Sequence, residues 1–297
     1  MQNFPAARCF SLKQYYPARW RGAFAQIYGA ILGFCGGFMG YIAIGDVHGH
    51  LGALDSLLDK VLRDFRADDT LIFLGDYIDD GPDSRGCVQR VIDLKKQYAS
   101  RVVALMGNHE QWLLRTLADY THHNWLFGMQ AFPTVRSYSS EAETQLRGEI
   151  RNRGWSWIRR RNPLDYGCFF SEVPSEHIEF LRGLQPSFRG GEYLFTHGGL
   201  DPGFPLRSQS PSLFIWGSLD FPLKYRGALH VVYGHRNNAV RMAGRPFPRI
   251  HRNTYGIDTV LQGVLTAVRF PEVEVLQSEP IPEALLATAG EISTCVS

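Results

Sequence analysis

Side chains that can bind metal ions recur where short apolar runs end in this sequence. The densest group is GDYIDDGPDS, Gly75–Ser84, which follows the apolar run LIFL and places four carboxylates within eight residues. The segments GDVHG, GNHE, HGG and YGH each add an aspartate, asparagine or histidine. Carboxylate, imidazole and amide groups in this mixture suit manganese, iron or zinc rather than calcium or a structural thiolate site. The candidate ligands are Asp46, His48, Asp76, Asn108, His197 and His235.

Six such groups are enough to hold two metal ions. Two divalent ions about 3.5 to 4 Å apart need a bridging carboxylate, can make hydroxide from water and clamp the attacking and leaving oxygens of a phosphoryl group. Asp76 is the best candidate for the bridge. Taken singly, an aspartate or histidine at a strand end is usually a cap or a satisfied polar group. That alternative has to hold six times here, so we predict a binuclear metal site.

The apolar runs predict the strands that position these groups. Runs rich in β-branched and aromatic residues lead into the five polar segments, at 41–44, 70–74, 101–106, 192–196 and 229–233. Apolar residues at helical spacing follow the first three, within 51–65, 88–98 and 111–120. Because the loops that leave an α/β sheet gather at one edge, we expect the five polar segments to face one another.

The segment 111–174 differs from its surroundings, since it is rich in tryptophan and arginine and carries no strand signal. We predict that it forms a helical cap over the edge of the sheet. Its basic run, WSWIRRR, is more typical of a solvated face than of a binding site.

Composition limits the class of protein. With 297 residues, 44% of them hydrophobic, the chain can bury the core of one large domain or two small ones. A net charge of +2, with the basic residues spread out, indicates neither a nucleic-acid partner nor a membrane partner. The five scattered cysteines contain no CxxC pair, which suits reduced thiols and a cytoplasmic location.

The first 38 residues are interpreted separately. No Asp or Glu precedes Asp46, and basic residues there are followed by the glycine-rich apolar segment IYGAILGFCGGFMG. We interpret 1–38 as an N-terminal extension of uncertain order ahead of a start at Met39, with export or membrane attachment as the alternative. The main domain is expected at 39–275, and 276–297 reads as a C-terminal tail.

Taken in order, GDVHG, GDYIDDG, GNHE, HGG and VVYGH resemble the calcineurin-like metallophosphoesterases. More narrowly, they resemble the PPP-type serine/threonine protein phosphatases and their bacterial relatives, and symmetrical diadenosine tetraphosphate hydrolases share most of the motifs. The resemblance covers about 41–270, with weaker echoes at NWLFGMQAFPTVRSYS and YGIDTV. It implies an α/β four-layer sandwich, two mixed β-sheets flanked by helices, with the cap at 111–174.

The resemblance also implies a role for each candidate residue. One metal ion would be held by Asp46, His48 and Asp76, and the other by Asp76, Asn108, His197 and His235. Manganese is expected, with iron or zinc as alternatives. His109 matches the family's general acid, and Asp79 matches the carboxylate that orients it.

This chain departs from the family pattern at two points. The usual GDxxDRG has an arginine that holds the substrate phosphate, where this chain has Asp80, and the usual WIR is replaced by WGS, Trp216–Ser218. Phosphoryl transfer relies on positive charge around the equatorial oxygens, so a substitute is needed. Arg85, Arg236 and Arg136 are the candidates, with ordinary surface arginines as the alternative.

Three functional hypotheses follow. The leading one is a metal-dependent phosphomonoesterase resembling serine/threonine protein phosphatases, with a phosphorylated protein or a small phosphoester as substrate. A symmetrical bis(5'-nucleosyl)-tetraphosphatase, with a dinucleotide substrate, is the alternative within the enzymes. A catalytically weakened relative that binds a phosphorylated partner is the third hypothesis, favoured by Asp80 and by WGS.

Overall fold

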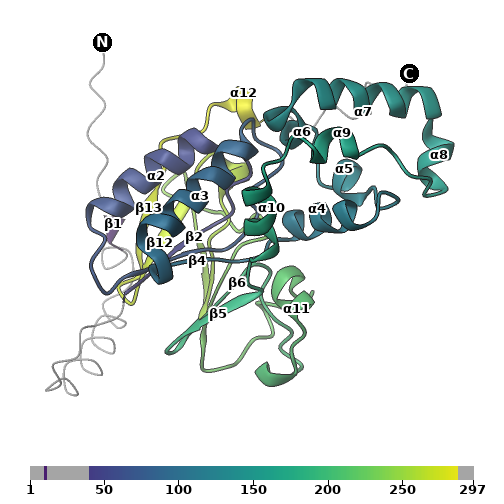
Figure 1. The fold of residues 1–297 in the computed structure, drawn as a ribbon. Coiled ribbons are helices and arrows are strands. Elements are labelled where there is room, and N and C mark those ends of the chain that lie inside the picture. Colours follow the sequence, from purple (N-terminus) through teal and green to yellow (C-terminus); the bar gives the residue numbers. More distant parts are fainter. Residues whose placement is uncertain (1–9, 12–39, 287–297) are drawn as a thin grey trace, which may run out of the picture.

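Two β-sheets face each other and carry helices on their outer sides in the computed structural model, which describes residues 10–11 and 40–286 (Figure 1). Both sheets mix parallel and antiparallel pairs, so the predicted α/β sandwich of two mixed sheets flanked by helices is confirmed. Most of the predicted N-terminal extension, 1–38, lies outside the described residues, as does the end of the predicted tail, 287–297.

The larger sheet holds the first three predicted strands as parallel neighbours. They are β2 (Tyr41–Ile44), β3 (Thr70–Phe73) and β4 (Val102–Ala104). On the other side of β2 the order continues with antiparallel β12 (Thr266–Phe270), β13 (Glu274–Gln277) and β1 (Phe10–Ser11). Residue 275, the predicted domain boundary, lies inside β13, and the chain stays packed as far as the buried Ile281.

The smaller sheet contains the other two predicted strands, again as parallel neighbours. Its order is β10 (Arg249–His251), β11 (Thr254–Gly256), β7 (His230–Tyr233), β6 (Tyr193–Thr196) and β5 (Ser187–Gly190). The strands β8 (Val240–Met242) and β9 (Arg245–Phe247) form a separate hairpin directly after β7.

Side chains of alternate residues in each central strand enter two different cores. In β2, Tyr41 and Ala43 face the second sheet, whereas Ile42 and Ile44 face the outer helices. The core between the sheets is largely aromatic. Phe270 of the first sheet contacts Tyr193 and Tyr255 of the second, with ring centroids 5.0 and 5.1 Å apart.

Two helices cover the outer face of the larger sheet. α2 (Leu51–Arg63) buries Leu54, Leu57, Leu58 and Val61, at helical spacing. α3 (Ser84–Tyr98) begins where Asp83 accepts a hydrogen bond from the backbone N–H of Gly86 at 2.7 Å. One of the four carboxylates of Gly75–Ser84 therefore caps a helix. α11 (Pro211–Trp216) lies beside the smaller sheet (Figure 1).

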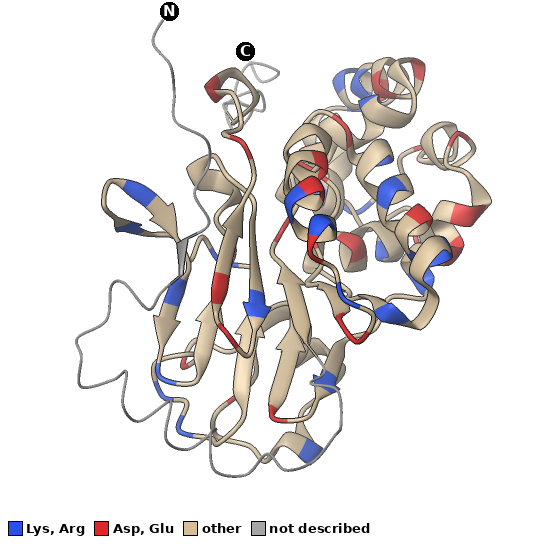
Figure 2. Cartoon of the chain, turned by 90° about the vertical axis from the view of Figure 1, so that its left-hand side faces the viewer, with Lys and Arg blue, Asp and Glu red and all other residues tan. Residues whose placement is uncertain are grey.

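The segment predicted as a cap contains helices joined by turns, has no strand, and lies to one side of the sandwich (Figure 1). It starts within α4 (Asn108–Ala118) and ends before α10 (Ser175–Arg182). Between them come α5 (Asn124–Gly128), α6 (Phe132–Tyr138), α7 (Ser140–Arg153), α8 (Trp155–Arg159) and α9 (Gly167–Phe170). Basic and acidic positions alternate over these helices (Figure 2).

The remaining elements are short. The 3-10 turns are Ala99–Arg101, Leu206–Ser208 and Val260–Gln262, and α12 (Glu283–Leu286) is the last element described. In the part of the chain that the structure describes, no helix has the length and apolar character needed to cross a bilayer.

Phe270→Ala tests the aromatic core between the sheets. Because the ring is fully buried and joins the two sheets, its loss is expected to lower the free energy of unfolding by about 3–5 kcal/mol. Urea denaturation measures this change. Phe204→Ala is the control, since its ring is 58% exposed, and equal losses in the two variants would contradict the assigned core.

Candidate metal centre and active site

Five loops meet at the carboxyl ends of β2, β3, β4, β6 and β7, as the sequence predicted. The backbone ties them together. The N–H groups of Val47 and His48 donate to the carbonyl of Asp76 at 3.0 and 2.9 Å, and the N–H of Gly234 donates to the carbonyl of His197 at 2.8 Å. These bonds join loops within each sheet, and the backbone N–H of His235 joins the two sheets by donating to the Asp46 carboxylate at 2.9 Å.

Asp76 lies at the centre of this edge and is buried. Its Oδ2 is 3.2 Å from Nε2 of His197, 3.6 Å from Nε2 of His48 and 3.8 Å from Nε2 of His109. Burial raises the pKa of the Asp76 carboxyl, but the imidazoles of His197 and His109 outweigh burial and hold the pKa well below its usual range. Asp76 is thus an ionised carboxylate that lies between the imidazoles of His197 and His48.

The other predicted ligands lie on either side of Asp76. Oδ1 of Asn108 is 2.8 Å from Nε2 of His197 and 2.7 Å from Nδ1 of His235. Oδ2 of Asp46 is 4.0 Å from Nε2 of His48, and the Asp46 carboxylate accepts a hydrogen bond from the backbone N–H of His235. The structure brings all six predicted side chains together.

The backbone is strained at several of the residues that carry these side chains. Five of the residues at this edge have left-handed φ angles, which are 44° at His48, 51° at Asp76, 74° at Asp79, 61° at Asp80 and 67° at His235. Gly234 makes room for a neighbour, because a Cβ on it would collide with Oδ1 of Asp46. Such conformations persist only where the surrounding structure enforces them, and they cluster at functional sites.

The imidazoles are oriented by their outward-facing nitrogens. Nδ1 of His197 lies 3.1 Å from the carbonyl of Leu74, and Nδ1 of His48 lies 3.2 Å from the carbonyl of Ile78. These contacts leave Nε2 of both rings directed at Asp76. Burial, followed by the charge of His197, lowers the pKa of His235 to about 3, so its ring is neutral. A neutral imidazole is the form that binds a metal ion, and a ring held through its other nitrogen presents the remaining nitrogen in a fixed direction.

Buried carboxylates accumulate here without a lysine or arginine partner. Five carboxylates are buried, and in residues 40–286 none forms an ion pair with a lysine or arginine; they are Asp46, Asp76, Asp79, Glu110 and Asp258. Burial, followed by the charges of Asp258 and Asp76, raises the pKa of Asp46. Oδ1 of Asp258 has no hydrogen-bond partner. A cation at this position would balance the charge, so the donor set fits divalent metal ions.

His109 and Asp79 form a pair at the edge of this cluster. Nδ1 of His109 is 2.8 Å from Oδ2 of Asp79. Burial lowers the pKa of His109, but the carboxylates of Asp76 and Asp79 outweigh burial and raise it to about 10. The ring therefore carries a proton, with Nε2 turned toward Asp76.

The cap holds Asp79 in position. Oγ1 of Thr134, on α6, donates to Oδ1 of Asp79 at 2.6 Å, and Nε1 of Trp125, on α5, donates to Oδ2 at 3.2 Å. Both residues lie in the sequence segment NWLFGMQAFPTVRSYS, in which sequence reasoning singled out Arg136 alone. The residues that orient Asp79 were missed because threonine and tryptophan carry no charge or ligand signal.

Glu110 and Asp258 were also missed. The Glu110 carboxylate accepts hydrogen bonds from the backbone N–H groups of Asp76, Tyr77, Ile78 and Gly107, and so joins the β3 loop to the start of α4. Asp258 follows β11 and lies close enough to Asp46 to raise its pKa. The segments GNHE and YGIDTV were noted in the sequence, and the glutamate of GNHE served as an indication of substrate class, but neither position was given a role in building the site.

The three candidate arginines have different surroundings. Arg136 donates to Glu143 through Nε and Nη2, at 2.6 and 2.8 Å. Arg85 is exposed, and its charge acts on Tyr138 and His177. Arg236 directly follows the candidate ligand His235, donates to the carbonyl of Ser218 at 3.3 Å, and its charge helps to lower the pKa of His235.

Residues 39–239 match the family model described as calcineurin-like phosphoesterase. The chain belongs to this family. Among solved structures, a crystal structure described as a "putative diadenosine tetraphosphatase" superposes with a TM-score of 0.54 at 20% identity, covering 82% of this chain and 94% of that one. This likeness supports the fold.

Three characterised relatives differ in the extent of their similarity. The zinc-dependent endopolyphosphatase of Saccharomyces cerevisiae is 31% identical over 167 residues, 55% of this chain and 48% of the relative. Serine/threonine-protein phosphatase 1 of Salmonella typhimurium is 40% identical over 86 residues, 28% of this chain and 35% of the relative. The asymmetrical bis(5'-nucleosyl)-tetraphosphatase PrpE of Halalkalibacterium halodurans is 26% identical over 260 residues, 80% of this chain and 92% of the relative. The matched part of this chain thus covers less than half of the length of each of the first two relatives.

Thr134→Val tests the support of Asp79 by the cap. The substitution keeps the shape of the side chain but removes the donor to a fully buried carboxylate, so the free energy of unfolding of the metal-free protein is expected to fall by about 1.5–3 kcal/mol. Chemical denaturation measures the change. Thr144→Val, on the exposed side of α7, is the matched control, and a Thr134→Val effect no larger than the control would refute the role of this bond.

Proposed function

We propose that this family member hydrolyses phosphoesters at a binuclear metal centre. Asp46, His48 and Asp76 would hold one ion, and Asp76, Asn108, His197 and His235 the other. The observation that carries the proposal is the shared position of Asp76, whose Oδ2 lies 3.2 Å from His197 and 3.6 Å from His48. Bound there, divalent ions supply Lewis acidity toward the phosphoryl oxygens and lower the pKa of water. Manganese is the expected metal, with iron and zinc as alternatives.

The side chains around this centre have separate tasks in the proposed mechanism. His109 donates the proton that the leaving oxygen needs, because its pKa is raised to about 10 and Asp79 fixes its Nδ1. Arg236 supplies positive charge near the phosphoryl group, in the role that the family arginine has elsewhere. No side chain has to form a covalent bond to phosphorus.

Two substrate classes remain in the proposal. Phosphomonoesters, including phosphorylated proteins, are favoured by GNHE and HGG and by the identity to the Salmonella phosphatase. Dinucleoside polyphosphates are favoured by the extent of similarity to the tetraphosphatase, which covers 80% of this chain. A weakened enzyme that binds a phosphorylated partner is disfavoured by the intact His109–Asp79 pair. The cytoplasmic location expected from the cysteines belongs to the same proposal.

His109→Ala tests the acid. With manganese added, kcat is expected to fall about 10²–10⁴-fold on an alkyl phosphate or phosphoserine peptide, whose leaving oxygen needs a proton. The loss should be far smaller on a nitrophenyl phosphate, whose leaving group departs as a stable anion. Steady-state kinetics on both substrates measure the difference.

The control for that comparison is His251→Ala, because His251 lies on the edge strand β10 and belongs neither to the proposed catalytic cluster nor to the cap. Equal losses on both leaving groups would show that His109 acts on binding or structure and not as the acid. Wild-type activity that survives complete removal of metal would overturn the binuclear proposal itself.

Asp80→Asn tests the residue that replaces the family arginine. Oδ2 of Asp80 is 3.3 Å from Nδ1 of His48, where a carboxylate strengthens the imidazole as a ligand. Removing the charge is expected to weaken manganese binding about 10-fold or more, measured by calorimetry. Asp68→Asn, at an exposed position before β3, is the control, and unchanged affinity in Asp80→Asn would leave Asp80 without this role.

A further inference from the structure

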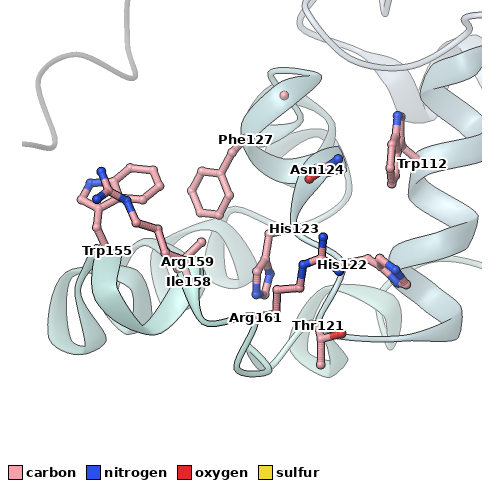
Figure 3. A pocket seen from close by; sticks show the side chains of 11 residues that line it. Trp112, Thr121, His122, His123, Asn124, Phe127, Trp155, Ile158, Arg159 and Arg161 are labelled. Atoms are coloured by element: carbon pink, nitrogen blue, oxygen red, sulfur yellow. The ribbon is translucent and has the colours of Figure 1, made fainter.

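A cavity of 520 Å³ lies inside the cap, outside the residues that we assign to metal binding and acid catalysis. Its walls come from α4, α5, α8 and the turn after α8 (Figure 3). Three aromatic residues and two arginines dominate the lining: Trp112, Phe127, Trp155, Arg159 and Arg161. The volume is within the range of small-molecule sites, about 300–1,000 Å³.

Two series of side-chain contacts connect the wall of the cavity with the candidate metal ligands. Trp112 lies one helical turn after Asn108 on α4, and its ring packs 6.4 Å from that of Trp216, which packs 5.7 Å from His235. On the opposite wall, Phe127 lies two residues before Met129. The Sδ atom of Met129 accepts a hydrogen bond from Nδ2 of Asn108 at 3.5 Å. These contacts place the cavity beside the metal centre.

The lining combines stacking surfaces with positive charge. The rings of Phe127 and Trp155 pack with centroids 5.0 Å apart, and both line the cavity (Figure 3). Arg159 and Arg161 are exposed, and neither forms an ion pair with a carboxylate of the described chain. His123 is a fixed wall, since its ring nitrogens contact Tyr166 and Asn162 at 2.9 and 3.0 Å.

Aromatic faces stack on nucleobases, and arginine binds phosphate and also stacks on planar groups. We propose that this cavity is a nucleoside subsite, and that the substrate is a dinucleoside polyphosphate whose phosphate chain reaches from the cavity to the metal centre. The inference rests on the proposed phosphoesterase activity. It assigns a binding function to part of WSWIRRR, which the sequence indicated as a solvated face.

The reaction that this placement implies is hydrolysis of one phosphoanhydride bond. The oxygen of water bonds to phosphorus, the bridging P–O bond breaks, and the departing phosphate oxygen takes its proton from His109. The protons of the attacking water pass to solvent and restore His109. Diadenosine tetraphosphate then gives either two ADP or ATP and AMP, depending on which anhydride lies at the centre.

Two variants of the full-length, manganese-loaded protein test the subsite. In one, Trp155→Ala removes a stacking surface; in the other, Arg159→Ala and Arg161→Ala are combined. Each is expected to raise KM for diadenosine tetraphosphate about 10- to 100-fold, while kcat/KM for nitrophenyl phosphate, which is too short to reach the cavity from the centre, stays within about twofold. The neighbouring Trp157→Ala and Arg160→Ala are matched controls, because neither residue lines the cavity.

The outcomes separate this inference from the proposed function. Unchanged KM for diadenosine tetraphosphate in both variants, with normal turnover of nitrophenyl phosphate, overturns the subsite and leaves the phosphoesterase standing. No turnover of either substrate by the wild type overturns the proposed function, and calorimetric binding of diadenosine tetraphosphate to wild type and variants then decides the subsite. If Trp155→Ala misfolds, the exposed arginine variant carries the test alone.

Discussion

Excess negative charge at one edge of the sandwich is the constraint on which the rest of this structure depends. Asp46, Asp76, Asp79, Glu110 and Asp258 are buried there, and in the described chain no lysine or arginine pairs with them, although the protonated His109 pairs with Asp79. Burying a charge without a partner is costly, so the site favours cations. Five loops meet there to assemble these groups. Residues with left-handed φ angles and the close approach of Gly234 to Asp46 make this arrangement possible.

One helix connects the chemical tasks proposed for this edge. α4 begins at Asn108 and His109, and one turn later Trp112 forms a wall of the cap cavity. The cap also holds Asp79 through Thr134 and Trp125. The cap segment is thus more than a cover, because α5 both carries Trp125, which contacts Asp79, and forms a wall of the cavity.

The structure shows what surrounds Asp80 and the segment WGS, the two points at which the chain departs from the family pattern. Asp80 faces His48, so its charge is directed at an imidazole rather than at the phosphate position. Ser218, within WGS, offers its carbonyl to Arg236, the arginine that follows His235. Gly217 is accounted for by a different neighbour, because a Cβ there would collide with the backbone carbonyl of Gly198.

The sequence by itself determined the strand ends and the six clustered side chains, because apolar runs that end in glycine and a ligand residue are a local pattern. It also led to Asp79 and His109 through their motifs. Only the tertiary structure decided what surrounds them. Thr134 lies 55 positions from Asp79, and Arg136 turns to Glu143 rather than inward. Such contacts depend on how distant helices pack, and side chains such as Thr134 and Trp155 carry no local signal of the partner or cavity that packing gives them.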